Sequence, residues 1–509
     1  MEISGLEASL VALMFLTVYL TVRITYPRKR GIPIHRPPIV KISLHDLLMQ
    51  PREAYELAMA EYGPVIGVHR LGKVEYIVSE EYFEEVLTND NRFSFERGIA
   101  HVDLAPKTNI FLNGSFIRDM HEVVTEGIIS RLSEIIENIA PIIIASTEQS
   151  IQEAILNSET RGSPVADVVA SSHRAISETM LTMFFGREAG LDDCAVSVCE
   201  EVSNRMVSVT GIDAYSKPWY IKFPWLYKMR SWARLILCLC RDAFPIFLPL
   251  LWRAIRNHNH GRTDLEDEKP SFMTLLLRRH VDQTTGHVPM RAIIPMACVL
   301  LGAIILVWVI FEIADRPEYI PLLREEIDSL CGADGIPTYD ELRRAERLDS
   351  FIREVMRTKG DVLGVMREAD EGCALGGYII PRGHLVYPLS TLAHMNTFLQ
   401  GFDAEQFDGT RWVRTGKLAT MPSMRYLVFG LGRFACPGRM LAITGAFSVA
   451  SSRVMDLCAD EGAEIKLWVI ALLRLATPAL EEKYTVSDLM SPSLAPRGTL
   501  LLHPIENHR

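Results

Sequence analysis

The sequence predicts a mainly α-helical protein with small β-sheets, preceded by one N-terminal transmembrane helix. Three observations support this fold class. Apolar residues recur with a helical period over long stretches, at residues 119–155, 164–186, 190–209, 230–257 and 318–331. Strand-like segments are short, at residues 65–71, 74–79 and 376–389. The third observation is an apolar run near the N-terminus.

Composition indicates a folded protein and excludes several classes. The chain has 509 residues, of which 48% are hydrophobic and 23% charged, so disorder and fibrous repeats are excluded. The net charge is −10 and no long basic run follows the first 40 residues, so we expect no nucleic-acid partner. The nine cysteines are odd in number and scattered, which indicates reduced thiols rather than a disulfide framework or a zinc site.

The apolar run from Ala8 to Val22 is the candidate membrane anchor. With its flanks it approaches the roughly 20 residues that a bilayer requires. Arg23, Arg28, Lys29 and Arg30 follow the run, whereas no lysine or arginine precedes it, so the positive-inside rule places the body of the protein in the cytosol. A cleaved signal peptide is the alternative, and it fits less well because a basic n-region is missing. Residues 1–30 are therefore predicted to be an anchor with a basic flank.

The rest of the chain is predicted to be one domain after a hinge. Residues 31–40 contain Pro33, Pro37 and Pro38, which form a stiff, extended connection. No repeat, low-complexity tract or Gly/Ser linker divides residues 41–509.

A second apolar run, residues 292–311, has no charged, hydroxyl or amide side chain. A helix that is apolar all round suits the centre of a large protein, and the same run is long enough to cross a membrane. We favour a buried central helix. The alternative, a second span, corresponds to a non-enzymatic membrane protein with two spans.

The stretch FGLGRFACPG, residues 429–438, carries the most chemical information. Its glycines allow the backbone to pass close to a flat ligand, and Pro437 and Gly438 suit a turn leading into a helix. A thiolate at Cys436 would meet backbone N–H groups and a helix N-terminus, which stabilise negative charge. By itself, the pattern is also compatible with a buried structural cysteine.

At these residues the sequence resembles the cytochrome P450 haem-thiolate monooxygenases. Their signature is Phe, two residues, Gly, three residues, Cys, one residue, Gly, which Phe429, Gly432, Cys436 and Gly438 match. The resemblance implies the cytochrome P450 fold and haem b, with Cys436 as the iron ligand. It also implies a set of residues around the cofactor, namely Phe429, Gly430, Gly432, Arg433, Gly438 and Arg367.

A second motif of the family lies upstream. Glu354 and Arg357 are three residues apart and so share one helical face. Such a pair is usually a solvated surface contact. The resemblance implies instead a buried network with a later arginine, which is Arg411 in the segment FDGTRW.

Two arginines are candidates for pairing with a haem propionate. Arg367 lies in a segment similar to the family's strand beside the haem, and a guanidinium–carboxylate contact there is physically sensible. The alternative for Arg367 is a surface arginine near Glu368. Arg433 is a similar candidate, but the residue two before the cysteine, often His or Arg in the family, is Phe434 here.

The chain departs from the family at two places. Family members carry an acid or amide and a threonine on the central helix, where they relay protons. Here Gly302 and Ala303 keep the small residues of the oxygen groove, and no acid or hydroxyl occurs from 292 to 311. After the cysteine, residues 443–463 interrupt a helical pattern that joining Ala442 to Glu464 would make continuous, so they are a surface loop or, as we favour, translated intron.

The resemblance implies a monooxygenase that uses dioxygen and takes electrons from NADPH through NADPH-cytochrome P450 reductase. It implies an apolar small-molecule substrate, a fungal secondary metabolite of terpenoid or polyketide type, and single-pass anchoring in the endoplasmic reticulum membrane with a cytosolic catalytic domain. Because the acid and alcohol are missing, a relative that isomerises or binds without normal oxygen activation stays open as an alternative.

Overall fold

A computed structural model describes the molecule at residues 35–70, 73–100, 122, 129–161, 165–166, 168–210, 223–259, 271–280, 305–332, 335–436, 439, 464–486, 489–490 and 496–505. Several sequence-based predictions lie outside these residues. They are the anchor (1–30), the start of the hinge, Gly302, Ala303, Gly438 and the segment 443–463.

The described residues are mainly helical, with short strands, which confirms that part of the predicted fold class. The longer helices are α3 (Pro51–Tyr62), α7 (Leu132–Arg161), α8 (Val168–Phe185), α10 (Asp193–Thr210), α12 (Pro224–Cys238), α13 (Phe244–Asn259), α14 (Phe272–His280), α16 (Ile305–Asp315), α17 (Ile320–Leu330), α19 (Glu346–Thr358) and α22 (Glu464–Leu475). The short helices are α2 (Leu44–Met49), α4 (Phe83–Thr88), α5 (Phe95–Ala100), α9 (Arg187–Gly190), α18 (Tyr339–Arg343), α20 (Ser390–Met395) and α21 (Thr397–Gln400).

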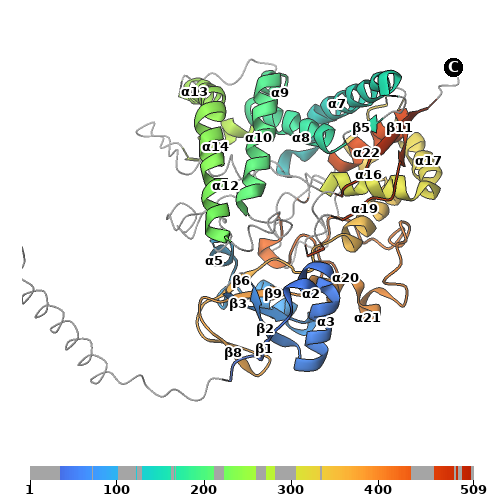
Figure 1. Ribbon diagram of the computed structural model, residues 1–509. Helices are drawn as coiled ribbons and strands as arrows, with labels where there is room; N and C mark the ends of the chain where they lie inside the picture. The colour runs from blue at the N-terminus through green and yellow to red at the C-terminus, as the bar shows by residue number, and fades with distance from the viewer. Residues whose placement is uncertain are drawn as a thin grey trace, which may run out of the picture.

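The strands form three small sheets. Their bounds are β1 (Ile39–Val40), β2 (Val65–Arg70), β3 (Lys73–Val78), β4 (Phe93–Ser94), β5 (Val165–Ala166), β6 (Arg367–Ala369), β7 (Cys373–Leu375), β8 (Tyr378–Ile380), β9 (Leu385–Pro388), β10 (Ala476–Leu480) and β11 (Leu500–Pro504). The largest sheet has the order β1-β2-β3-β9-β6-β4, and the others are β10-β11-β5 and β7-β8. In Figure 1 the six-stranded sheet lies with α2 and α3 in the lower part of the view, and α7 to α14 lie in the upper part.

The three predicted strand segments are found as β2, β3, β8 and β9. Half of the residues in β2 and β3 are β-branched, which favours extended backbone. The two strands pair antiparallel from Val65↔Val78 to Arg70↔Lys73, and β9 joins β3 in parallel. β9 also pairs antiparallel with β6, with Arg367 opposite Val386. This pairing ties the N-terminal strands to the segment that carries Arg367.

The prediction of a helix over residues 164–186 is wrong for the first residues of this range, because α8 starts at Val168. Val165 and Ala166 form β5, which pairs antiparallel with β11 through Val165↔Leu501 and Ala166↔Leu500. The helical periodicity of the sequence includes these residues, but their backbone groups form hydrogen bonds with β11, near the C-terminus. A pairing partner so distant in sequence cannot be predicted from the local pattern of residues.

The central apolar run is described from residue 305 onward, as α16. Trp308, Val309 and Ile310 are buried in the largest hydrophobic core, together with residues of α7, α19 and α22. Over this part of the run, burial inside the protein body favours the central-helix interpretation over a second span.

The predicted helix at 230–257 is longer than expected. It begins at Pro224, continues through one π-helical turn at Leu239–Ala243 and ends at Asn259. Residues Trp225–Asn257 form one helix that is long and apolar enough to cross a membrane, by length and composition alone, and 22% of its most apolar window is buried. Within the described part of the chain it is the one helix that meets this test.

Candidate functional site

The loop before Cys436 is a tight turn built on two glycines. Gly430 and Gly432 have φ values of 74° and 72°, a left-handed conformation that glycine adopts without a steric penalty. The backbone N–H of Cys436 donates to the carbonyl oxygen of Phe429 at 2.7 Å, which closes the turn. Phe429 is buried in the main core, whereas Cys436 is exposed. The loop is therefore anchored in the core by Phe429 and holds Cys436 at an exposed position.

Arg439 supports the loop from the C-terminal side, and sequence reasoning missed it. Its side chain donates to the carbonyl oxygens of Cys436 at 2.8 Å and Thr420 at 3.1 Å. Burial lowers the pKa of Arg439, and the charge of Cys436 opposes this effect. The only available signal was an arginine three residues after the cysteine, which could reach back over one helical turn.

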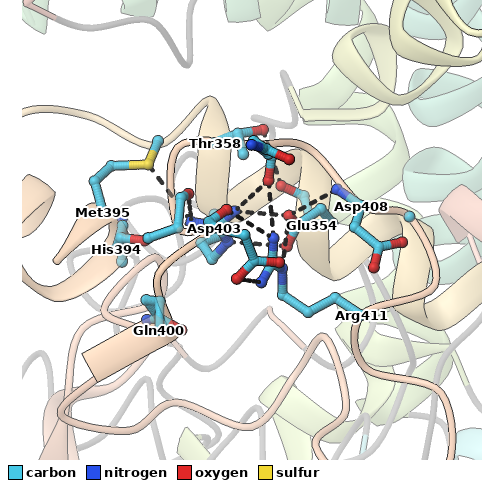
Figure 2. A network of polar contacts seen from close by, with 12 residues as sticks. Glu354, Thr358, His394, Met395, Gln400, Asp403, Asp408 and Arg411 are labelled. Carbon is cyan, nitrogen blue, oxygen red and sulfur yellow. Dashed lines mark hydrogen bonds and ion pairs between the residues drawn. The ribbon is translucent and has the colours of Figure 1, made fainter. Parts of the chain in front are cut away.

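The structure brings Glu354, Arg357 and Arg411 together. Figure 2 shows Arg411, Asp403 and Asp408 around Glu354. Glu354 and Arg357 lie on α19, and both side chains are fully buried. Arg357 donates from Nη2 and Nε to the two carboxylate oxygens of Glu354, at 2.6 and 2.9 Å. Arg411 donates from Nε to Glu354 Oε1 at 3.1 Å. The buried carboxylate of Glu354 thus accepts hydrogen bonds from two guanidinium groups, and its contact with Arg357 is bidentate.

More donors and acceptors complete this network than the motif indicated. Trp412 Nε1 donates to Glu354 Oε2 at 3.0 Å, and the backbone N–H of Asp408 donates to Oε1 at 3.1 Å. Asp403 pairs with Arg411 at 2.9 Å. Trp412 and Asp408 belong to the segment FDGTRW that pointed to Arg411, but nothing in the sequence singled out Asp403. The network fixes α19 to the chain segment that precedes the cysteine loop.

His394 links the same network to the cysteine loop. Its backbone carbonyl accepts from Arg357 Nη1 at 2.6 Å, and its ring Nε2 accepts from the backbone N–H of Leu427 at 2.9 Å. Burial, helped by the positive charges of Arg357 and Arg353, lowers the pKa of His394 to about 3. The imidazole is therefore neutral at physiological pH, which leaves Nε2 able to accept.

Arg367 is the first residue of β6, and its side chain is fully buried. Among the described residues, its guanidinium donates only to backbone carbonyl oxygens, those of Met366 at 3.1 Å, Leu87 at 3.3 Å and Val365 at 3.5 Å. Its Nε has no hydrogen-bond partner there. Burial lowers the pKa of Arg367 to about 10, against the opposing charge of Asp90, so the group stays protonated at pH 7. The structure thus places Arg367 in the interior, unlike a surface arginine paired with Glu368.

Arg433 lies in a different environment. Its side chain is 64% exposed and pairs through Nε with Asp90 at 2.5 Å. Burial raises the pKa of Asp90, and Arg433 and Arg367 oppose the rise. The two arginines that sequence reasoning treated alike therefore differ: Arg433 already has a carboxylate partner, whereas Arg367 is buried with its Nε unpaired among the described residues.

The residues present fit a haem group. The exposed thiol of Cys436 offers a soft ligand that suits haem iron. Gly430 and Gly432 have no Cβ atoms, so the backbone of the loop can lie close to a flat ligand. Their left-handed conformation is unfavourable for most other residues. The buried Arg367 guanidinium, whose Nε has no partner within the described part of the chain, matches an anionic propionate.

Sequence comparison agrees with this geometry. The family model of cytochrome P450 matches residues 36–452. The cytochrome P450 monooxygenase claR of Ampulloclitocybe clavipes is 29% identical over 39% of this chain and 38% of its own length. For the cytochrome P450 monooxygenase atmQ of Aspergillus flavus the identity is 35%, over 27% of this chain and 28% of the relative.

A plant relative matches over more of the chain. The isoflavone 2'-hydroxylase of Medicago truncatula is 23% identical over 85% of this chain and 87% of its own length. The matches to the two fungal relatives, by contrast, span less than half of those proteins. Because the family model covers most of the sequence and includes the cysteine loop, the chain belongs to the cytochrome P450 family.

Proposed function

We propose that the chain is a haem-thiolate monooxygenase that oxidises an apolar small molecule with dioxygen. The observation that carries the proposal is the cysteine loop, in which an exposed Cys436 is held by two left-handed glycines and by Arg439. Fungal relatives named as cytochrome P450 monooxygenases support the reaction class.

Each part of the site has a role that follows from its geometry. Cys436 would hold the iron through its thiolate, and the bound haem would supply dioxygen activation, which a thiolate ligand favours. Arg367 would bind a propionate, exchanging weak contacts to carbonyl groups for a charge-assisted one. The network around Glu354 and His394 keeps the loop in place, because it is buried and its groups are multiply hydrogen-bonded.

The electron donor, the substrate and the location are part of the same proposal. Electrons would come from NADPH through NADPH-cytochrome P450 reductase, and the substrate would be an apolar fungal secondary metabolite of terpenoid or polyketide type. The residue pattern at 8–30 supports single-pass anchoring in the endoplasmic reticulum membrane with the catalytic domain in the cytosol. The relatives named as cytochrome P450 monooxygenases include fungal proteins, which is why a fungal metabolite is proposed.

The test is expression in microsomes that contain a cytochrome P450 reductase. Under ¹⁸O₂ and NADPH, with extracts of the producing organism as substrate source, we expect products that carry one ¹⁸O atom. Products formed without ¹⁸O, or formed equally without NADPH, would contradict the monooxygenase proposal.

A second candidate function is a haem-thiolate protein that isomerises or binds its ligand without normal oxygen activation. The supporting observation is on the central helix, where the first acid after residue 292 is Glu312. This carboxylate is fully buried, lies 3.2 Å from Lys359 Nζ, pairs with Arg316 and accepts from the hydroxyl of Tyr484. These contacts hold the Glu312 side chain between α16 and its neighbouring segments. Oxygen consumption that does not rise with NADPH and substrate would favour this second candidate.

A further inference from the structure

The residue two before the cysteine, Phe434, takes part in a stack of aromatic and cationic groups. The Phe434 ring stacks on the Phe95 ring, with centroids 5.0 Å apart and planes 29° from parallel. The guanidinium carbon of Arg367 lies 4.7 Å from the centroid of the Phe95 ring. Phe95 therefore connects the cysteine loop to the buried guanidinium.

Strand pairing places Phe95 beside Arg367. β4 pairs antiparallel with β6 through Phe93↔Ala369 and Ser94↔Glu368. Continuing this register by one residue places Phe95, which follows β4, opposite Arg367. α5 starts at Phe95 and lies beside β6 (Figure 1). At Gly98 of α5, a Cβ atom would come within 3.0 Å of the Met366 carbonyl oxygen. Glycine at this position thus permits the close approach of α5 to the strand that carries Arg367.

Phe434 is held from the side of the cysteine loop. A Cβ atom on Gly432 would lie 3.3 Å from the Thr88 side chain, so the loop packs tightly against the end of α4. The ion pair between Arg433 and Asp90 fastens the same turn to the segment between α4 and β4. The carbonyl oxygen of Leu87, also at the end of α4, accepts from Arg367 Nη2. The loop and the guanidinium therefore share one supporting segment.

The stack matters because Arg367 has no carboxylate hydrogen-bonded to it among the residues that the structure describes. Its described hydrogen bonds have donor–acceptor distances from 3.1 to 3.5 Å, at the long end of the usual range. A planar guanidinium is attracted to an aromatic face, and this attraction is stronger where water is excluded. The Phe95 ring thus restricts the plane of the guanidinium, and Phe434 restricts the Phe95 ring.

We propose that Phe95 and Phe434 are positioning residues that hold the Arg367 guanidinium for ionic contact with a haem propionate, in a chain that has no cation at residue 434. The inference rests on the proposed haem-thiolate function and adds to it a role for two aromatic residues. It predicts that the two rings act through Arg367, and that their removal loosens haem without changing the iron ligand.

The experiment measures the rate of haem transfer from purified full-length holoprotein to excess apomyoglobin. We expect Phe95→Leu to raise this rate roughly fivefold, the factor that corresponds to a single cation–π contact. Phe434→Leu removes the ring that stacks on Phe95, and an aromatic pair contributes a similar energy, so we expect a rise of roughly the same size. Phe434→Tyr keeps the ring and should change the rate less than about twofold. The matched control is Phe398→Leu, because Phe398 is 95% exposed on α21 and should leave the rate unchanged.

A double-mutant cycle separates positioning from general packing. In an Arg367→Met background, Phe95→Leu should change the haem transfer rate less than about twofold, because the cation that the ring supports is gone. If Arg367→Met gives no holoprotein, Arg367→Gln replaces it, since glutamine also removes the charge but keeps polar groups that can donate to the neighbouring carbonyl oxygens. An unchanged rate in the single variants, or an equal effect of Phe95→Leu in both backgrounds, would overturn the inference.

The same samples distinguish failure of this inference from failure of the proposed function. The reduced, carbon monoxide-bound spectrum of the parent reports thiolate ligation, and we expect Phe95→Leu and Phe434→Leu to keep it. A parent protein without haem or without the thiolate spectrum would overturn the proposed function and, with it, this inference. A parent with that spectrum but insensitive variants would overturn the positioning role alone.

Discussion

Replacing Glu354 should be among the most destabilising single changes in the chain. The carboxylate is fully buried and accepts hydrogen bonds from Arg357, Arg411, Trp412 and the backbone of Asp408. Removing it leaves a fully buried guanidinium without its counter-charge and several donors without acceptors. Breaking a buried pair in this way costs about 3 to 5 kcal/mol, so we expect Glu354→Ala to lower the free energy of unfolding by about that amount.

Glu354→Gln tests whether charge or volume is responsible. The amide preserves size, but its NH₂ group faces donors and it supplies no negative charge. We therefore expect it to be nearly as damaging as alanine. The matched control is Glu325→Gln, because Glu325 also pairs with an arginine, Arg347, but its side chain is 72% exposed. Exposed ion pairs contribute little, so the control should leave the urea midpoint unchanged.

The assay is urea unfolding followed by tryptophan fluorescence and by far-ultraviolet circular dichroism. Coincident transitions by the two probes allow the midpoint and slope to be converted to a free energy. The yield of haem-loaded protein provides a second reading that needs no unfolding model. If both Glu354 variants lost less than about 1 kcal/mol, the view that this network fixes the cysteine loop would be refuted, because buried pairs normally cost more.

The remaining predictions concern pH, packing and the segment after the cysteine. His394 has a pKa of about 3 when folded against an ordinary 6.5, so its contribution to stability is present above pH 6.5 and is lost as the pH falls toward 3. At pH 5 the total loss should reach about 2 kcal/mol, and His394→Gln should reduce this dependence in urea titrations; an equally steep dependence in the variant would exclude His394 as its source. Gly98→Ala should lower stability by about 1 to 3 kcal/mol, because its Cβ would meet backbone atoms of Met366 and Arg367, and an unchanged urea midpoint would show that α5 is free to shift. A chain that joins Ala442 to Glu464 should bind haem at least as well as the full chain, as measured by haem content per protein; haem loss in this chain, with residues 443–463 encoded in every transcript, would show that the segment belongs to the protein.

The local parts of the fold were accessible from the sequence. The strands at 65–71 and 74–79 are found because β-branched residues and turn residues mark them within a few positions. Glu354 and Arg357 could be paired because three residues separate them on one helix. Arg411 followed only from the family resemblance, since 53 residues of chain, including β6 to β9, lie between it and Arg357.

The long-range parts were not accessible. β5 depends on β11, more than 300 residues away, and the helical period at 164–186 gave no sign of that partner. The difference between Arg367 and Arg433 depends on Asp90 and Phe95, which lie in a segment without any motif. Burial and pairing of such groups are set by tertiary packing, so residue spacing along the chain cannot reveal them.

The most direct measurement of the central claim is the spectrum of the reduced, carbon monoxide-bound protein. Substituting serine at Cys436 removes the sulfur while nearly preserving size, so folding should suffer less than ligation. We expect the parent to show the red-shifted Soret band of thiolate ligation and Cys436→Ser to lack it, because the thiolate supplies the electron density that shifts the band. An identical reduced carbonyl spectrum in the parent and in Cys436→Ser would contradict the assignment of Cys436 as the haem ligand.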